Sequence, residues 1–151
     1  MSTEISANAA QDVLANGSVI FTEMPIPCLQ GNVVFRDGSG LVRLANKFFR
    51  QNIMSCWRRK TNYKVSFNAN LGLPATGGTP GPLQLAVFID GEMDPSSIMQ
   101  VEAAANPALY NVGADVIVQV PYICSCSSVS VRNISNQTVT VANANLVISP
   151  A

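Results

Sequence analysis

The clearest pattern in the sequence is the strict alternation of apolar and polar residues from Tyr63 to Leu71. The odd positions of this segment are all apolar, and the even positions, from Lys64 to Asn70, are all polar. Because successive side chains of a β-strand point to opposite faces, this period of two predicts a strand with one buried and one wet face. A wet face favours a mostly antiparallel sheet that is covered on one side only.

Further strands are expected on both sides of this segment. Apolar or alternating segments bounded by turn-forming residues occur at 18–22, 33–36, 41–44, 83–91, 115–122, 127–134 and 139–148. The turn Asp37–Gly40 predicts a hairpin, and the Pro-containing segment Pro25–Cys28 is expected to break the ladder, because proline cannot donate a hydrogen bond into it. The sequence therefore predicts an all-β fold, an antiparallel β-sandwich or jelly roll of about eight to ten strands.

Three segments need a closer interpretation. Residues 47–60 fit either a short helix or a strand with a corner. Asp94 and Pro95 are typical of a helix start, but the surrounding β pattern favours a strand at Ser97–Glu102. In the last strand the apolar positions change from odd to even, which predicts a β-bulge near Val141 and Ala142.

Length and composition indicate one domain that contacts other subunits. The 151 residues suffice for one core, with residues 1–16 expected as an N-terminal arm and residues 17–151 as the sandwich domain. No apolar run is long enough for a membrane span, and no secretion signal is recognisable. Only 12% of the residues are charged, about half of the usual share, so part of the surface is expected to be covered by other subunits.

The charges are unevenly distributed although their sum is zero. Eight of the nine basic residues lie between positions 36 and 64, where Asp37 is the only acid, so this window carries +7 and the rest of the chain −7. One interpretation is a basic face that docks onto an acidic partner; the other is neutralisation by the acidic half of the chain or of a neighbouring subunit. Nucleic acid is disfavoured as the partner because the net charge is zero. The candidate docking residues are Arg43, Lys47, Arg50, Arg58, Arg59 and Lys60.

Little in the sequence points to catalysis or to a bound metal. There is no histidine, which removes the commonest general base and zinc ligand. The spacings of the four cysteines do not match a zinc site; buried thiols, disulfides and a metal remain open for Cys28, Cys56, Cys124 and Cys126. The acidic cluster Asp90, Glu92 and Asp94 fits either a solvated turn or a calcium site. We therefore expect no enzyme activity, no catalytic residue, no cofactor and no metal.

Several segments, taken in order, resemble the TNF/C1q-like jelly-roll family in its bacterial and prophage form, such as the C-terminal domain of collagen-like spore-surface glycoproteins. The matching motifs are VLANGSVIF, FRDGSGLVRL, YKVSFNANLG, LQLAVFIDGE and VSVRNISNQTVTVANANLVI, which span most of residues 13–149. The resemblance implies a ten-strand jelly roll that forms a homotrimer through its inner sheet. The chain departs from the spore glycoproteins in having no Gly-X-Y repeats before the domain.

These features lead to a leading hypothesis and two alternatives. The first is a trimeric capsid decoration protein of a phage virion, assembled in the bacterial cytoplasm, with the capsid or another virion protein as partner. The second is a trimeric receptor-binding or adhesin knob that recognises a glycan or protein of the host surface. The third is a coat module of a spore or bacterial surface. Neither a nucleic acid nor a membrane is expected as partner, and the candidate subunit contacts are Phe88, Tyr110 and Tyr122.

Overall fold

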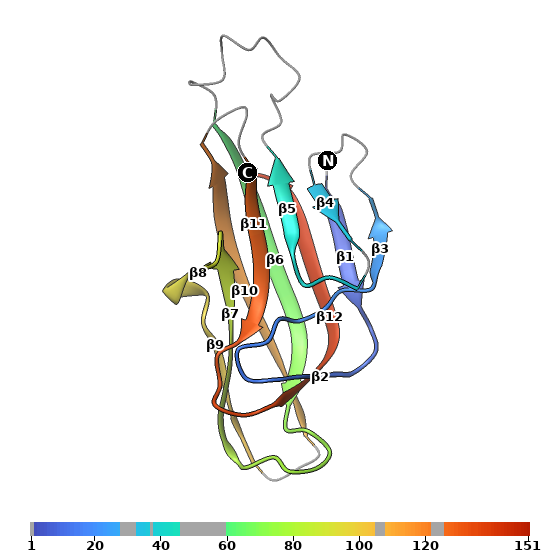
Figure 1. The fold of residues 1–151 in the computed structure, drawn as a ribbon, viewed down its shortest axis with the longest axis vertical. Helices are drawn as coiled ribbons and strands as arrows, with labels where there is room; N and C mark the ends of the chain where they lie inside the picture. The colour runs from blue at the N-terminus through green and yellow to red at the C-terminus, as the bar shows by residue number, and fades with distance from the viewer. Residues whose placement is uncertain (1, 28–32, 37, 46–59, 105–107, 122–125) are drawn as a thin grey trace.

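Two antiparallel six-stranded sheets pack face to face and form a sandwich, which confirms the all-β fold expected from the sequence (Figure 1). The computed structural model describes residues 2–27, 33–36, 38–45, 60–104, 108–121 and 126–151. Sheet A has the strand order β10-β6-β12-β1-β3, with β2 paired to β12. Sheet B has the order β4-β5-β11-β7-β8, with β9 paired to β7.

Each sheet is assembled from strands that lie far apart in the sequence. Sheet A consists of β1 (Thr3–Ala7), β2 (Gln11–Val13), β3 (Glu23–Ile26), β6 (Thr61–Gly72), β10 (Leu109–Val120) and β12 (Val139–Pro150). Sheet B consists of β4 (Val33–Phe35), β5 (Val42–Ala45), β7 (Gly81–Ile89), β8 (Glu92–Met93), β9 (Met99–Ala103) and β11 (Cys126–Asn133). One short 3-10 helix, η2 (Pro95–Ser97), precedes β9.

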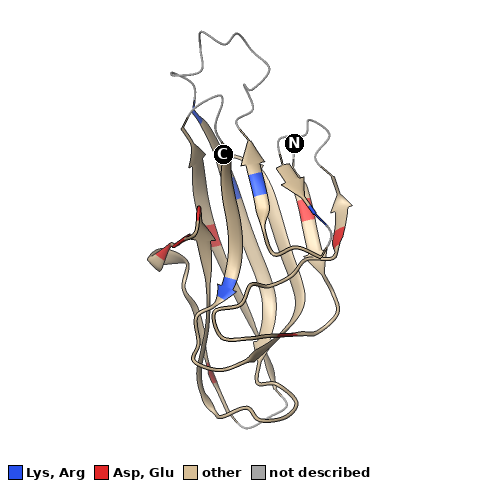
Figure 2. Cartoon of the chain, viewed as in Figure 1, with Lys and Arg blue, Asp and Glu red and all other residues tan. Residues whose placement is uncertain are grey.

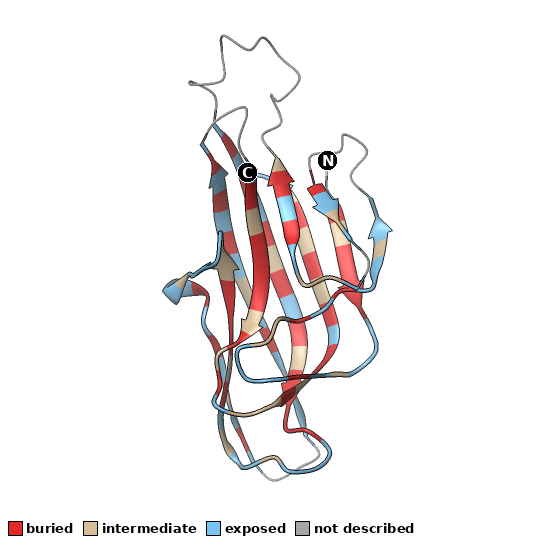
Figure 3. Ribbon diagram, in the orientation of Figure 1, coloured by how far each residue is buried: buried red, intermediate tan, exposed pale blue. Residues whose placement is uncertain are grey.

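Strand β6 lies inside sheet A between β10 and β12, as its alternation predicts. Its odd positions from Tyr63 to Leu71 are at most 3% exposed. Lys64 and Asn68 on the other face are exposed. Figure 3 shows the strands banded by buried and exposed residues in this way. The ladder to β10 runs from Thr61 to Gly72 without a bulge, so the register that buries the apolar face is kept over the whole strand.

The core lies between the two sheets and includes Phe21, which comes from a segment outside the named strands. The Phe21 and Phe67 rings meet edge to face, with centroids 6.5 Å apart and planes at 79°. Both side chains are almost completely buried, and such a pair stabilises a fold by about 0.5–1.5 kcal/mol beyond its area burial.

The parity change in the last strand does produce a β-bulge. The register of β12 against β6 shifts between Ala142 and Asn145, and Asn143 adopts a φ of 54°. The extra residue lets Val139 and Val141 before the shift, and Leu146 and Ile148 after it, all face the core.

The N-terminal third differs from expectation in two places. Residues 1–16, expected as an arm, contribute β1 and β2 to sheet A, where Ile5 is completely buried. The strand expected at Ser18–Thr22 is reduced to isolated bridges at Ser18 and Phe21. Strand β3 instead includes Pro25, which is tolerated because β3 lies at the edge of sheet A and need not donate on its outer side.

The conflict at Asp94 is resolved by two successive short elements. The Asp94 side chain caps the single turn η2, as its helix-start pattern indicates, and the favoured strand follows as β9. The hairpin around Asp37–Gly40 is also present, with β4 paired to β5 and a positive φ at Gly38. Residues 47–59 of the ambiguous segment lie outside the described residues.

Candidate functional site

The outer face of sheet A carries several amide side chains close together. Strands β6, β10 and β12 contribute them at positions that point away from the core, since the register sets Asn68 between Gly113 and Asn145. These residues line an open depression of about 720 Å³, here called the amide trough, together with Ser66, Asn111, Asp115, Asn143 and Val147.

The amides of this face are hydrogen-bonded to one another across the strands. Asn111 Nδ2 donates to Asn68 Oδ1 at 2.9 Å and to Asn70 Oδ1 at 3.3 Å. Asn70 Nδ2 in turn donates to Asn143 Oδ1 at 3.5 Å. The bond between Asn111 and Asn68 is short and the other two are long, so the face presents a linked set of donors and acceptors.

Two backbone features shape the trough. The bulge at Asn143 brings an extra polar side chain to it, which is a common use of bulges near functional surfaces. Gly113 lines the trough and fills none of it, because it has no side chain; a Cβ there would lie 3.2 Å from the carbonyl oxygen of Phe67.

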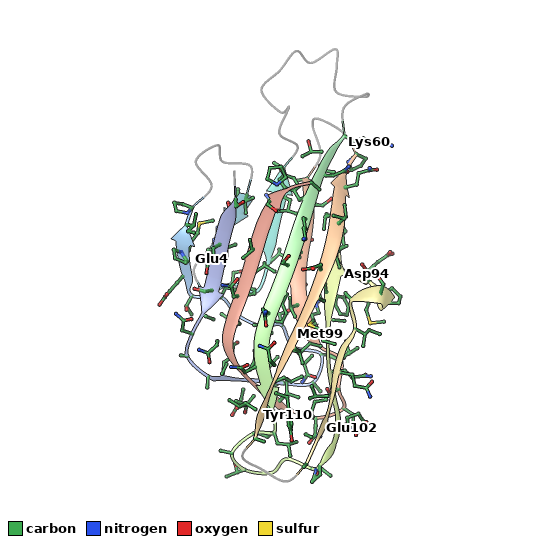
Figure 4. The ribbon with its side chains drawn as sticks, turned by 180° about the vertical axis from the view of Figure 1, so that it is seen from behind. Glu4, Lys60, Asp94, Met99, Glu102 and Tyr110 are labelled. Atoms are coloured by element: carbon green, nitrogen blue, oxygen red, sulfur yellow. The ribbon has the colours of Figure 1, made fainter. Side chains whose placement is uncertain are left out.

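One charged and one apolar group complete the face. On β1, Glu4 Oε1 accepts a hydrogen bond from Asn145 Nδ2 at 2.6 Å (Figure 4). On β10, Ile117 is 58% exposed at a position that shares the face with Asp115 and Gln119. An exposed isoleucine beside ordered amides is suited to contact with another macromolecule.

The outer face of sheet B has a different chemistry. The guanidinium carbon of Arg132 on β11 stacks 4.6 Å from the ring centroid of Phe88 on β7. The Arg132 Nε–H is buried and has no hydrogen-bond partner. Arg43 on β5 is exposed, and its side chain forms no hydrogen bond or ion pair with another described residue.

The structure places only some of the predicted docking residues. Arg43 lies in sheet B, whereas Lys60 directly precedes β6 at one end of sheet A (Figure 4). Lys47, Arg50, Arg58 and Arg59 lie outside the described residues, so the proposed basic face stays a prediction.

Of the three predicted subunit contacts, the structure describes Phe88 and Tyr110. Phe88 points away from the core and is half-buried beneath Arg132. Tyr110 points inward and packs partly against the core, so its ring is not a free contact on the outer face. Tyr122 lies outside the described residues.

The acidic cluster between β7 and β9 takes part in local structure. Asp90 and Gly91 form a turn with positive φ at both residues, and Asp90 Oδ1 accepts from the Ser128 amide at 2.9 Å. Asp94 Oδ1 accepts from the Ser96 amide at 3.0 Å and from its hydroxyl at 2.7 Å. Within the described ranges, no group of three or more histidine, cysteine, aspartate or glutamate side chains is arranged to hold a metal ion.

Of the four cysteines, the structure describes Cys126, an exposed free thiol at the start of β11. Cys28, Cys56 and Cys124 lie outside the described residues. Within the described part of the chain, no helix is long and apolar enough to cross a membrane.

The polar side of β6 was expected to be a solvated face, and the amide trough was not predicted. Asn111, Asn143 and Asn145 come from strands more than 40 residues further along the chain, and their proximity follows only from the strand order. The repeated asparagines at outward positions of three strands were the available signal.

These features define an antiparallel β-sandwich of the TNF-like jelly-roll fold. The chain is similar to the structure of Eiger TNF from S. frugiperda, with a TM-score of 0.65 and 6% identity, over 100% of this chain and 92% of that chain. It is also similar to murine APRIL, with a TM-score of 0.56 and 6% identity, over 100% of both chains. At this identity the likeness concerns the fold alone. No protein-family model matches the sequence, and comparison with curated proteins gives no match.

Proposed function

We propose that the protein is a non-enzymatic structural component of a phage virion, a homotrimer that decorates the capsid after assembly in the bacterial cytoplasm. The observation that carries the proposal is the outer face of sheet A, where bonded amides and the exposed Ile117 form a contact surface on a TNF-like jelly roll. The sequence resemblance implies a homotrimer formed through one sheet, and sheet A offers this surface.

The low charge of the chain supports coverage by other subunits. Only 12% of the residues are charged, and Ile117 is one of several large apolar side chains left exposed in a single chain. Self-association on sheet A removes such groups from water. Residues 3–7 and 11–13 belong to sheet A, so they do not form a free N-terminal arm. Docking to the capsid is therefore assigned to the basic window, residues 36–64.

The trimer is tested by size-exclusion chromatography of the full chain with light scattering, which measures the mass of the species. The wild type is expected at three times the chain mass of 16.0 kDa at micromolar concentration. Ile117→Lys is expected to weaken the trimer, because it places a charge in the contact. Leu14→Lys, at an apolar side chain that is 70% exposed outside the strands, is the matched control and is expected to remain trimeric. A wild type that stays monomeric would remove the trimer from the proposal.

The virion role is tested by mass spectrometry of particles purified from cells that express the chain. Many copies per particle are expected for a decoration protein. A few copies indicate a fibre or spike instead, and absence from the particles overturns the virion role.

A second candidate is a knob that binds a host-surface glycan, and the amide trough favours it. Planar amides and the Asp115 carboxylate offer donors and acceptors suited to sugar hydroxyls. This candidate requires the trough to stay open, whereas the trimer proposed above covers it. Saturable binding of the full chain to host cells, lost in Asn111→Ala, would support this function. Cell binding that Asn111→Ala leaves unchanged would count against the trough as its site.

A further inference from the structure

The outer face of sheet B combines an apolar centre with opposite charges at its two edges. Its central row runs from Ser130 on β11 through Phe88 on β7 to Met93 on β8. Met93 is 40% exposed, and Leu41, directly before β5, is 47% exposed. Aromatic, methionine and arginine side chains are enriched in protein interfaces, and this face has all three.

The basic edge of the face lies at strands β4 and β5. Arg36 directly follows β4, Arg43 belongs to β5, and both are exposed. Neither forms a hydrogen bond or ion pair through its side chain with another residue in the described ranges.

The acidic edge lies at the opposite side of the sheet. Asp90, at the turn between β7 and β8, is exposed, and its Oδ1 accepts a hydrogen bond from the Ser128 amide of β11. Glu92 pairs with Ile89, which packs against the core, so Glu92 lies on the other face of the sheet. Figure 2 shows the red residues of this turn across the sheet from the blue residue on β5. Charges of one chain that stay apart in this way are available to a second chain.

The strand order makes this arrangement self-complementary. Consider two copies that face each other across a two-fold axis parallel to the strands. The axis sets β4 and β5 of one copy against β7 and β8 of the other, because the order β4-β5-β11-β7-β8 is reversed across it. Each basic edge then meets an acidic edge, and Leu41 meets the apolar row of Phe88 and Met93.

We infer that the outer face of sheet B is an isologous contact with a second copy of this chain. Two sets of opposite charges flank an apolar centre in this contact, which fixes the register of the two copies and excludes water from the Phe88–Arg132 stack. The contact goes beyond the proposed trimer, since it uses the opposite sheet. A trimer that also has this contact assembles beyond three copies.

Sedimentation velocity of the full chain between 1 and 100 μM, in 0.1 M salt, tests the contact. The wild type is expected to be trimeric at the low end of this range and to form species with an even number of chains, such as the hexamer, as the concentration rises. Arg43→Glu and Asp90→Lys each place like charges opposite each other and are expected to weaken the contact about tenfold. The combined charge swap Arg43→Glu/Asp90→Lys restores opposite charges and is expected to return the dissociation constant to within about threefold of the wild type.

Leu41→Lys is expected to abolish the even-numbered species, while Leu14→Lys leaves them unchanged; circular dichroism confirms that each variant is folded.

The trimer proposed above and the sheet B contact fail in different ways. If only the trimer is wrong, Ile117→Lys leaves the sheet B dimers intact. A wild type that shows only monomers or trimers at 100 μM, or a charge swap that is no better than the single variants, overturns the sheet B contact.

Discussion

Arg132 and Phe88 form a stacked pair that covers small residues on the outer face of sheet B. The guanidinium carbon lies 4.6 Å from the ring centroid, and the two residues come from the paired strands β11 and β7. Ala86, which pairs with Arg132, and Ser130, which pairs with Phe88, point away from the core, yet are only 0% and 4% exposed. The stack therefore shields this part of the sheet in the single chain.

Replacing Arg132 separates the role of its apolar stem from that of its charge. Arg132→Ala removes both the cover and the cation–π contact and is expected to lower the free energy of unfolding by about 1–2 kcal/mol. Arg132→Met keeps an apolar cover and removes the buried, unpaired Nε–H, so we expect about half that loss or less. Urea denaturation of both variants measures the difference. Equal losses in the two variants would show that the charge, and not the cover, stabilises the sheet.

Gly72 is required where β6 ends beside the start of β10. A Cβ at this position would lie 2.6 Å from the carbonyl oxygen of Ala108 and 2.7 Å from Leu109 Cδ2. Gly72→Ala is therefore expected to destabilise the fold by about 1–3 kcal/mol, because the backbone of the adjacent segment must shift. Gly113→Ala is the matched control on the same pair of strands. A Cβ at Gly113 would lie 3.2 Å from its nearest atom, so Gly113→Ala is expected to lose less stability than Gly72→Ala. Thermal unfolding of both variants measures the difference. A Gly72→Ala variant as stable as the wild type would contradict the close approach.

The sequence was sufficient for the fold wherever local periodicity and burial agree. Alternation predicted β6, and the parity change near Val141 and Ala142 predicted the bulge that the structure has between Ala142 and Asn145. Strand β1 was missed because residues 1–16 have no sustained period. Its burial depends on pairing with β12, more than 130 residues away in the sequence. The strand at Pro25 was missed because an edge position, which permits proline, is a property of the sheet and not of the segment.

The candidate sites were harder to predict, because each is built across strands. Phe88 was expected at a subunit contact from its outward position, but its stacking partner Arg132 is 44 residues away. Tyr110 was expected at a contact as an aromatic residue. The continuous register of β10 against β6 turns it inward instead. Nothing in a single strand shows that the asparagines of β6, β10 and β12 meet in one trough.

The bulge at Asn143 depends on a residue that tolerates a positive φ. Asn143 has a φ of 54°, a conformation that asparagine adopts more easily than other non-glycine residues. Asn143→Val is expected to destabilise the protein by about 1–2 kcal/mol, because a β-branched residue is strained there. Asn143→Gly keeps the conformation accessible and is expected to stay within about 0.5 kcal/mol of the wild type in urea denaturation. If the two variants were equally unstable, the side-chain bond to Asn70, and not the backbone, would explain the effect.

Calcium is expected to leave the stability of the protein unchanged. The carboxylates of Asp90 and Asp94 already accept hydrogen bonds from Ser128 and Ser96, and the Glu92 side chain is exposed. Thermal unfolding with and without millimolar Ca²⁺ is expected to give the same Tm, whereas a specific ion that binds the folded state raises it. Mg²⁺ at the same concentration controls for ionic strength. A rise in Tm with Ca²⁺ alone, lost in Glu92→Gln, would show that the turn binds the ion.

Asn133 links three segments through one buried side chain. Among the described polar residues, its replacement is expected to lower the free energy of unfolding most. It is completely buried; its Nδ2 donates to the carbonyl oxygens of Val13 at 3.0 Å and Gln137 at 2.8 Å, and its Oδ1 accepts from the Ser135 amide at 2.9 Å. Asn133→Ala leaves these three backbone groups without their partner, so we expect a loss of about 2–4 kcal/mol in urea denaturation. Asn133→Asp is expected to lose at least as much, because a carboxylate cannot donate to the two carbonyls.

The exposed Asn136 in the same loop provides the control for Asn133. Asn136→Ala is expected to change the free energy of unfolding by less than about 0.5 kcal/mol. Hydrogen exchange adds a local readout, since the Asn16 amide donates to the Asn133 carbonyl at 2.8 Å and the Asn133 amide to the Gly17 carbonyl at 2.9 Å. Faster exchange at Asn16 in a still-folded Asn133 variant would show that the side chain holds the N-terminal strands against the C-terminal half. Unchanged exchange and stability in Asn133→Ala would mean that the surrounding backbone bonds suffice without it.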